Sequence, residues 1–213
     1  LLKEVMEGTA EEVSKEIHAS IRVLESRGAT TQEISLPSLN YALSSYYIIA
    51  MSEASSNLAR YDGLRYGYES GFTEEDWHHS YSKNRAQGFG DEVKKRLIMG
   101  TFVLIAGYYE RFYLKALAAR SRVKQDFNNQ FKKFDVVVGP TMPLLPFKLG
   151  EKLTDPLALY LCDIDTVPAN LAGLPSISIP VGHQIPIGLQ VIGPALSEEM
   201  VINIARIYED AVI

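Results

Sequence analysis

The sequence has a single cysteine and no long apolar run. These two features bear on the compartment in which the protein works and on whether it spans a membrane. Cys162 cannot form an internal disulfide, so a reducing compartment, the cytoplasm, is expected. No apolar stretch reaches the roughly 18 residues of a membrane-spanning helix, so no membrane span is expected. The formal net charge of −5 over 213 residues, with no long run of like charges, argues against nonspecific nucleic-acid binding as the main task.

The familiar signatures of catalysis are also missing. The sequence contains no GxSxG elbow, no Walker loop, no dinucleotide-binding glycine triplet and no His/Cys/carboxylate cluster with metal-ligand spacing. His78 and His79 are adjacent, so on a helix they point in different directions and are interpreted as solvated surface residues. Cys162 is interpreted as a small buried residue rather than a nucleophile. We therefore expect no catalytic residue, metal site or cofactor within this chain.

The chain begins at Leu1 without a methionine, which suggests that an N-terminal portion of the protein precedes it. Any targeting segment would lie in that portion, and an organellar location then stays open.

Helical and strand patterns alternate along the chain, which places it in the α/β class. Helices are predicted over residues 9–27, opened by a capping box at Thr9, and over 37–60, whose first two-thirds is expected to be deeply buried. Further helices are predicted from 73, from 91 with a bend at Gly100, over 108–133, and from the cap at 197. Strands are predicted at 30–36, 135–140, 176–179 and 188–192.

Residues 163–193 organise the rest of the chain. Prolines and glycines recur through this segment at near-regular spacing, so no long helix can run through it. Asp163 and Asp165 stand just before its strands, among apolar residues. A carboxylate beside a buried sheet usually needs a cationic partner, which makes Asp163 the first functional candidate and Asp165 its closest rival.

Several motifs resemble those of one protein family. They are the run SEASSNLARYDG at 52–63, RYG at 65–67, GFGDEVKKR at 88–96 and PANLAGLP at 168–175. The chain resembles the amidase-signature family, in particular its members that serve as the glutaminase (A) subunits of tRNA-dependent amidotransferases. The resemblance covers nearly the whole chain but only the C-terminal part of those proteins. It implies that residues 1–213 are the C-terminal portion of a single amidase domain, with a mixed β-sheet flanked by helices.

The resemblance also implies how the chemistry is divided. The family's catalytic lysine and two serines lie in the N-terminal part, so none is expected here and the chain alone is expected to be inactive. By resemblance, Arg96 meets the carboxylate of glutamine, Asp163 meets its α-ammonium group and Tyr47 lines the pocket. This agrees with physical expectation, since only arginine offers a planar, bidentate fork to a carboxylate.

The partners implied by the resemblance are glutamine, the B and C subunits of the amidotransferase, and Glu-tRNA(Gln) or Asp-tRNA(Asn), with ATP and Mg²⁺ used by the partner subunit. The turn at 183–185 is shorter than the family's and lacks its glycine. Two other functions stay open: an amidase-signature hydrolase of simple or fatty amides, and a non-catalytic scaffold. As an alternative to the clamp, Arg96 and Asp163 could form a structural salt bridge or be separately solvated, and Tyr47 could be a core residue.

Overall fold

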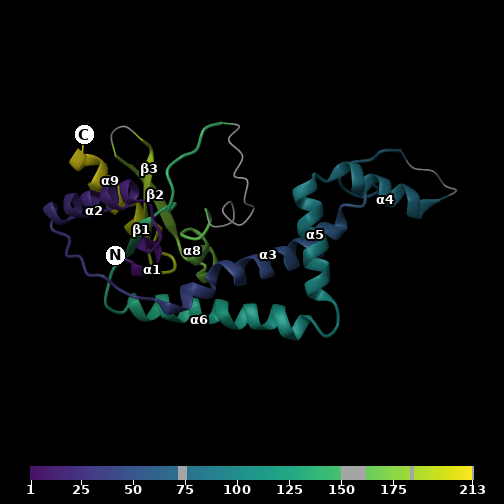
Figure 1. Cartoon of the computed structure of the whole chain (residues 1–213), viewed down its shortest axis with the longest axis horizontal. Coiled ribbons are helices and arrows are strands. Elements are labelled where there is room, and N and C mark those ends of the chain that lie inside the picture. The colour runs from purple at the N-terminus through teal and green to yellow at the C-terminus, as the bar shows by residue number, and fades with distance from the viewer. Residues whose placement is uncertain (72–75, 150–161, 183–184, 213) are drawn as a thin grey trace. The chain divides into compact units, whose positions relative to one another are not determined.

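The computed structural model describes residues 1–71, 76–149, 162–182 and 185–212 (Figure 1). They group into two compact units, one made of residues 1–43 and 119–213 and the other of residues 44–118. Helices α3 (Ala42–Asn57) and α6 (Leu114–Gln130) each run across the boundary between the units. The predicted helix start at 73–75 and most of the turn at 183–185 lie outside the described residues.

The first unit contains a three-stranded antiparallel sheet in the order β1–β3–β2. Its strands are β1 (Val137–Pro140), β2 (Ser176–Val181) and β3 (Ile187–Ile192). The register sets Val191 of β3 opposite Val138 of β1 and Ile177 of β2. The α/β class and these three strands are confirmed. The predicted strand at 30–36 is reduced to one isolated parallel bridge between Leu2 and Ile34, outside the named strands. Among the described residues the sheet is antiparallel rather than mixed as expected.

One face of this sheet packs against α2 (Glu11–Ser26) and α9 (Glu198–Val212), which lie alongside it in Figure 1. The two helices also contact each other, because each carries an apolar stripe at helical spacing. Between them, the hydroxyl groups of Ser20 and Tyr208 lie 3.2 Å apart inside the core. The core of this unit consists of Val13, Ile17, Ile21, Val138, Ile179, Val181, Ile187, Leu189, Val191, Val201, Ala205 and Tyr208.

The predicted capping box at Thr9 is wrong. Helix α2 begins at Glu11 with Ala10 in the capping position, and no side chain caps it. The Thr9 hydroxyl instead donates to the carbonyl oxygen of Val5 in the short helix α1 (Lys3–Met6), at 2.7 Å. Thr9 is thus one residue too early to cap α2, and its hydroxyl serves the end of α1.

Residues 163–193 fold as the prolines and glycines predict, without a long helix. The only helix among the described residues of this segment is α8 (Val167–Ala172), with Pro168 in its first turn, where its missing N–H costs nothing. Gly173 ends α8 in the left-handed conformation, with φ 69° and ψ 49°. The chain is then free to enter β2.

The second unit is helical. It comprises most of α3, α4 (Trp77–Gly88), α5 (Asp91–Leu104), the π-helical turn η3 (Tyr109–Tyr113) and the first turn of α6, with the short 3₁₀ turn η2 (Leu58–Arg60) after α3. A 3₁₀ turn, η1 (Pro37–Tyr41), precedes α3, so helical structure runs from 37 to 60 as predicted. The expected deep burial is wrong, because residues 46–50 of α3 are only half-buried.

Two glycines of this unit, Gly100 and Gly107, differ in their effect on the helices. The predicted bend at Gly100 is wrong, since α5 continues through it to Leu104. Gly107, with φ +88°, lies in the turn that separates α5 from η3 and α6. The predicted helix 108–133 is therefore present as η3 followed by α6.

Candidate functional site

Arg96 projects from the second turn of α5 in the second unit. Its Nε donates a 2.9 Å hydrogen bond to Oε1 of Glu92, four residues earlier on the same helix. Both side chains are partly solvated, Arg96 at 38% exposure and Glu92 at 54%. Glu92 was not identified from the sequence, although the i, i+4 spacing of a glutamate and an arginine on a helix is a sufficient signal for this contact.

Tyr47 lies on α3 in the same unit and is half-buried. Its ring packs edge-on against the ring of Tyr46, with centroids 5.2 Å apart and an interplanar angle of 72°. A half-buried tyrosine with an aromatic neighbour has a fixed ring and an accessible edge, which suits a residue that lines a binding site. The core role of Tyr47, the alternative to lining the pocket, also stays open.

The loop at 61–71 in the second unit is held by a buried asparagine. Oδ1 of Asn84 on α4 accepts hydrogen bonds from the backbone N–H of Ser70 at 2.8 Å and from its hydroxyl at 2.7 Å. Nδ2 of Asn84 donates to the carbonyl oxygen of Asp62 at 3.3 Å. These hydrogen bonds hold the tyrosine- and glycine-rich loop in one conformation, and the sequence alone did not identify Asn84 as the residue responsible.

Asp62 closes the start of the same loop. Its carboxylate accepts hydrogen bonds from the backbone N–H groups of Arg65 and Leu64, and from the Arg65 guanidinium, at 2.9 Å each. These donors, the backbone N–H of Arg65 first, hold the pKa of Asp62 well below its usual range. Asp62 is therefore fully ionised at neutral pH and serves the loop structure.

Asp163 belongs to the first unit and is exposed, in the turn that leads into α8. Its carbonyl oxygen accepts hydrogen bonds from the backbone N–H groups of Thr166 and Val167, at 3.2 and 3.0 Å. The backbone of Asp163 is thus fixed by the helix start, while its side chain is presented at the surface. This placement suits a residue that meets a ligand.

Asp165, two residues later, is buried, whereas Asp163 is exposed. Its side chain is 1% exposed, and among the described residues its Oδ2 has no hydrogen-bond partner. Burial raises the pKa of Asp165 to about 7, because the charged form loses its hydration. Burial likewise raises the pKa of the Cys162 thiol, helped by the charge of Asp163, so the interpretation of Cys162 as an unreactive buried residue is supported.

The three predicted site residues are divided between the units. Arg96 and Tyr47 come from the second and Asp163 from the first. The clamp predicted from Arg96 and Asp163 therefore stays a prediction. Its two alternatives, a structural salt bridge between Arg96 and Asp163 or separate solvation of the two side chains, stay open as well.

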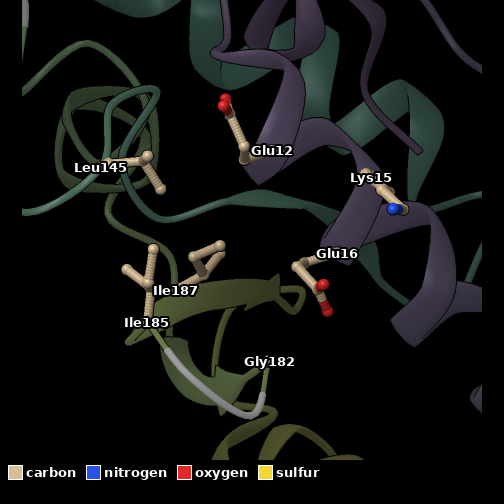
Figure 2. A pocket seen from close by; sticks show the side chains of 7 residues that line it. All are labelled: Glu12, Lys15, Glu16, Leu145, Gly182, Ile185 and Ile187. Carbon is tan, nitrogen blue, oxygen red and sulfur yellow. The ribbon is translucent and has the colours of Figure 1, made fainter.

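A separate pocket of about 350 Å³ opens in the first unit (Figure 2). Leu145, Ile185 and Ile187 gather on one side of it, facing the α2 residues Glu12, Lys15 and Glu16. None of the predicted site residues lines it. The described residues contain no group of three or more His, Cys, Asp or Glu side chains placed to hold a metal ion.

Comparison with known proteins identifies the family. A family model described as Amidase matches residues 2–202. The chain belongs to the Amidase family. It is 54% identical over 205 residues to the A subunit of glutamyl-tRNA(Gln) amidotransferase from Methanosarcina mazei, covering 95% of this chain and 43% of that protein. It is 49% identical over 209 residues to the protein of the same name from Halobacterium salinarum, covering 97% and 49%.

A solved structure of this family shares the fold. The crystal structure of the A subunit of glutamyl-tRNA(Gln) amidotransferase from Thermotoga maritima matches with a TM-score of 0.73 and 36% identity, over 98% of this chain and 41% of that one. The chain thus spans less than half the length of the amidase relatives it matches. Among its described residues, no helix has the length and apolar character needed to cross a membrane.

Proposed function

We propose that this chain is the glutamine-binding part of the amidase subunit of a tRNA-dependent amidotransferase. The observation that carries the proposal is 54% identity, over 95% of the chain, to the A subunit of a glutamyl-tRNA(Gln) amidotransferase. The full protein would hydrolyse glutamine to glutamate and ammonia. The ammonia would convert Glu-tRNA(Gln) to Gln-tRNA(Gln), Asp-tRNA(Asn) to Asn-tRNA(Asn), or both.

Within this chain, Arg96 and Asp163 are the residues proposed to recognise glutamine. Glutamine carries a carboxylate and an ammonium group on the same carbon, and a simple amide carries neither. One guanidinium and one carboxylate therefore distinguish the two substrates. Arg96 stands on a regular helix and Asp163 on a turn fixed by the start of α8, so the backbone of each is well defined. Tyr47 is proposed to line the same site.

The bond-breaking residues are proposed to lie in the part of the amidase that this chain does not span. That part would supply the lysine and two serines of the amidase mechanism. ATP and Mg²⁺ would be used by the B subunit to activate the carboxyl group on the tRNA, and the small C subunit would complete a cytoplasmic complex. The 213-residue chain alone should then release no ammonia from glutamine.

The test is amide transfer by the full-length protein in its complex with the B and C subunits. With glutamine labelled with ¹⁵N in the side-chain amide, ATP, Mg²⁺ and Glu-tRNA(Gln), the label should appear in Gln-tRNA(Gln). Hydrolysis of simple amides with no use of glutamine would contradict the proposal. Ammonia release from glutamine by the isolated 213-residue chain would contradict the assignment of catalysis to the remainder of the protein.

A further inference from the structure

Glu92 and Arg96 form a pair whose geometry restricts the guanidinium group. The contact is made at Nε, the nitrogen nearest the side-chain stem, with Oε1 of Glu92 2.9 Å away. Both residues stand on one regular helix, so their backbone positions relative to each other are fixed by α5 itself. The glutamate precedes the arginine by four residues, the favourable order for such a pair.

A hydrogen bond at Nε restricts the orientation of the guanidinium group of Arg96. The guanidinium is planar, and rotation about the bond to Nε changes the direction in which its terminal nitrogens point. An acceptor fixed at Nε limits that rotation. A carboxylate that reaches Arg96 is then received in a defined plane, which is what bidentate recognition requires.

We propose that Glu92 is a positioning residue, which orients Arg96 for the carboxylate of the substrate. This inference rests on the proposed function of Arg96 and assigns Glu92 a part in substrate specificity. Glu92 acts through Arg96 and does not touch the substrate. Its removal should therefore weaken recognition of the α-carboxylate without changing the chemical step.

A purely structural role for the pair makes different predictions. Exposed i, i+4 ion pairs stabilise a helix only slightly. Loss of such a pair would lower the stability of α5 a little and would affect all substrates alike. A matched control lies one residue away, where Asp91 pairs with Lys94 on the same helix at 3.3 Å.

The experiment measures KM and kcat for glutamine with the full-length enzyme in its complex, for Glu92→Ala, Glu92→Gln and Asp91→Ala. Glu92→Ala should raise KM about tenfold, equivalent to one lost oriented contact, with kcat nearly unchanged. Glu92→Gln keeps an oxygen acceptor for Nε and should stay within about threefold of wild type. Asp91→Ala should leave both constants unchanged.

A second substrate separates positioning from general damage. 4-Aminobutanamide is glutamine without its carboxylate, so its hydrolysis should be slow but equally so in wild type, Glu92→Ala and Arg96→Lys. An unchanged KM for glutamine in Glu92→Ala, or equal losses with both substrates, would overturn the role of Glu92. If Arg96→Lys also leaves the KM for glutamine unchanged, the proposed function of Arg96 fails instead.

Discussion

Gly100 of α5 lies directly against the backbone carbonyl group of Met51 of α3. A Cβ atom at Gly100 would overlap the carbonyl oxygen and carbon of Met51 and would press on the Cβ of Ser55 at 2.8 Å. Beside this contact, the hydroxyl groups of Ser55 and Thr101 lie 2.8 Å apart. The crossing of α3 and α5 therefore depends on a residue without a side chain.

Substitution Gly100→Ala should destabilise the second unit. The new methyl group would meet backbone, which cannot rotate away, so the two helices must separate. Overpacking of this kind costs about 1–3 kcal/mol, which outweighs the roughly 1 kcal/mol gained from the better helix propensity of alanine. The measurement is the midpoint of chemical unfolding of the full-length protein.

The control for this prediction is Ile98→Ala on the same helix. The Ile98 side chain is 71% exposed, so its removal should change the midpoint little. A Gly100→Ala protein as stable as wild type would show that α3 and α5 do not approach each other so closely.

Substitution Asn84→Ala should release the loop at 61–71. The side chain of Asn84 is 2% exposed and connects Ser70 to Asp62. Its loss leaves buried polar groups unpaired, at about 1–3 kcal/mol. We expect faster proteolytic cleavage within the loop, read by mass spectrometry. Lys83→Ala, an exposed neighbour on α4, should cleave at the wild-type rate, and equal protection in both variants would contradict the role of Asn84.

Substitution Asp165→Asn should stabilise the protein at neutral and alkaline pH. The pKa of Asp165 is raised from 3.8 to about 7 in the folded state. Between these values the folded state holds a proton that the unfolded state has lost. Stability therefore falls as pH rises through this window, by up to about 1.4 kcal/mol per pH unit, and levels off above it. Asparagine does not titrate, so the variant should lack this loss.

The measurement for Asp165 is the free energy of unfolding at pH 5 and pH 8. Wild type should lose stability between the two, and Asp165→Asn should lose less. Asp163→Asn is the control, because that side chain is exposed in the same turn. Identical pH dependence in wild type and Asp165→Asn would show that Asp165 is not buried as a carboxyl group.

Much of the fold is predictable from the sequence because its signals are local. The apolar stripe at Val13, Ile17 and Ile21 identifies the buried face of α2, and the alternation of Ile177 and Ile179 with Ser176 and Ser178 identifies β2. Pro168 and Gly173 mark the first turn and the end of α8. These residues act through their own backbone preferences or periodicity, without reference to distant parts of the chain.

The sequence could not settle features that depend on packing. It ranks Asp163 ahead of Asp165 but cannot say which of them is buried. The path of the turn into α8 exposes Asp163 and buries Asp165. It suggests a bend at Gly100, whereas the glycine serves the close approach of α3. Thr9 has the spacing of a residue that caps α2, yet its hydroxyl donates to the carbonyl oxygen of Val5 in α1.

The central claim is that Arg96 and Asp163 select glutamine by its charged groups. It is tested most directly by kcat/KM of Arg96→Lys and Asp163→Ala in the full-length complex, with glutamine and with a simple amide. Each variant should lose about 10- to 150-fold with glutamine, the value of one charge-assisted contact, and keep its rate with the simple amide. Unchanged kcat/KM for glutamine in both variants would contradict the account.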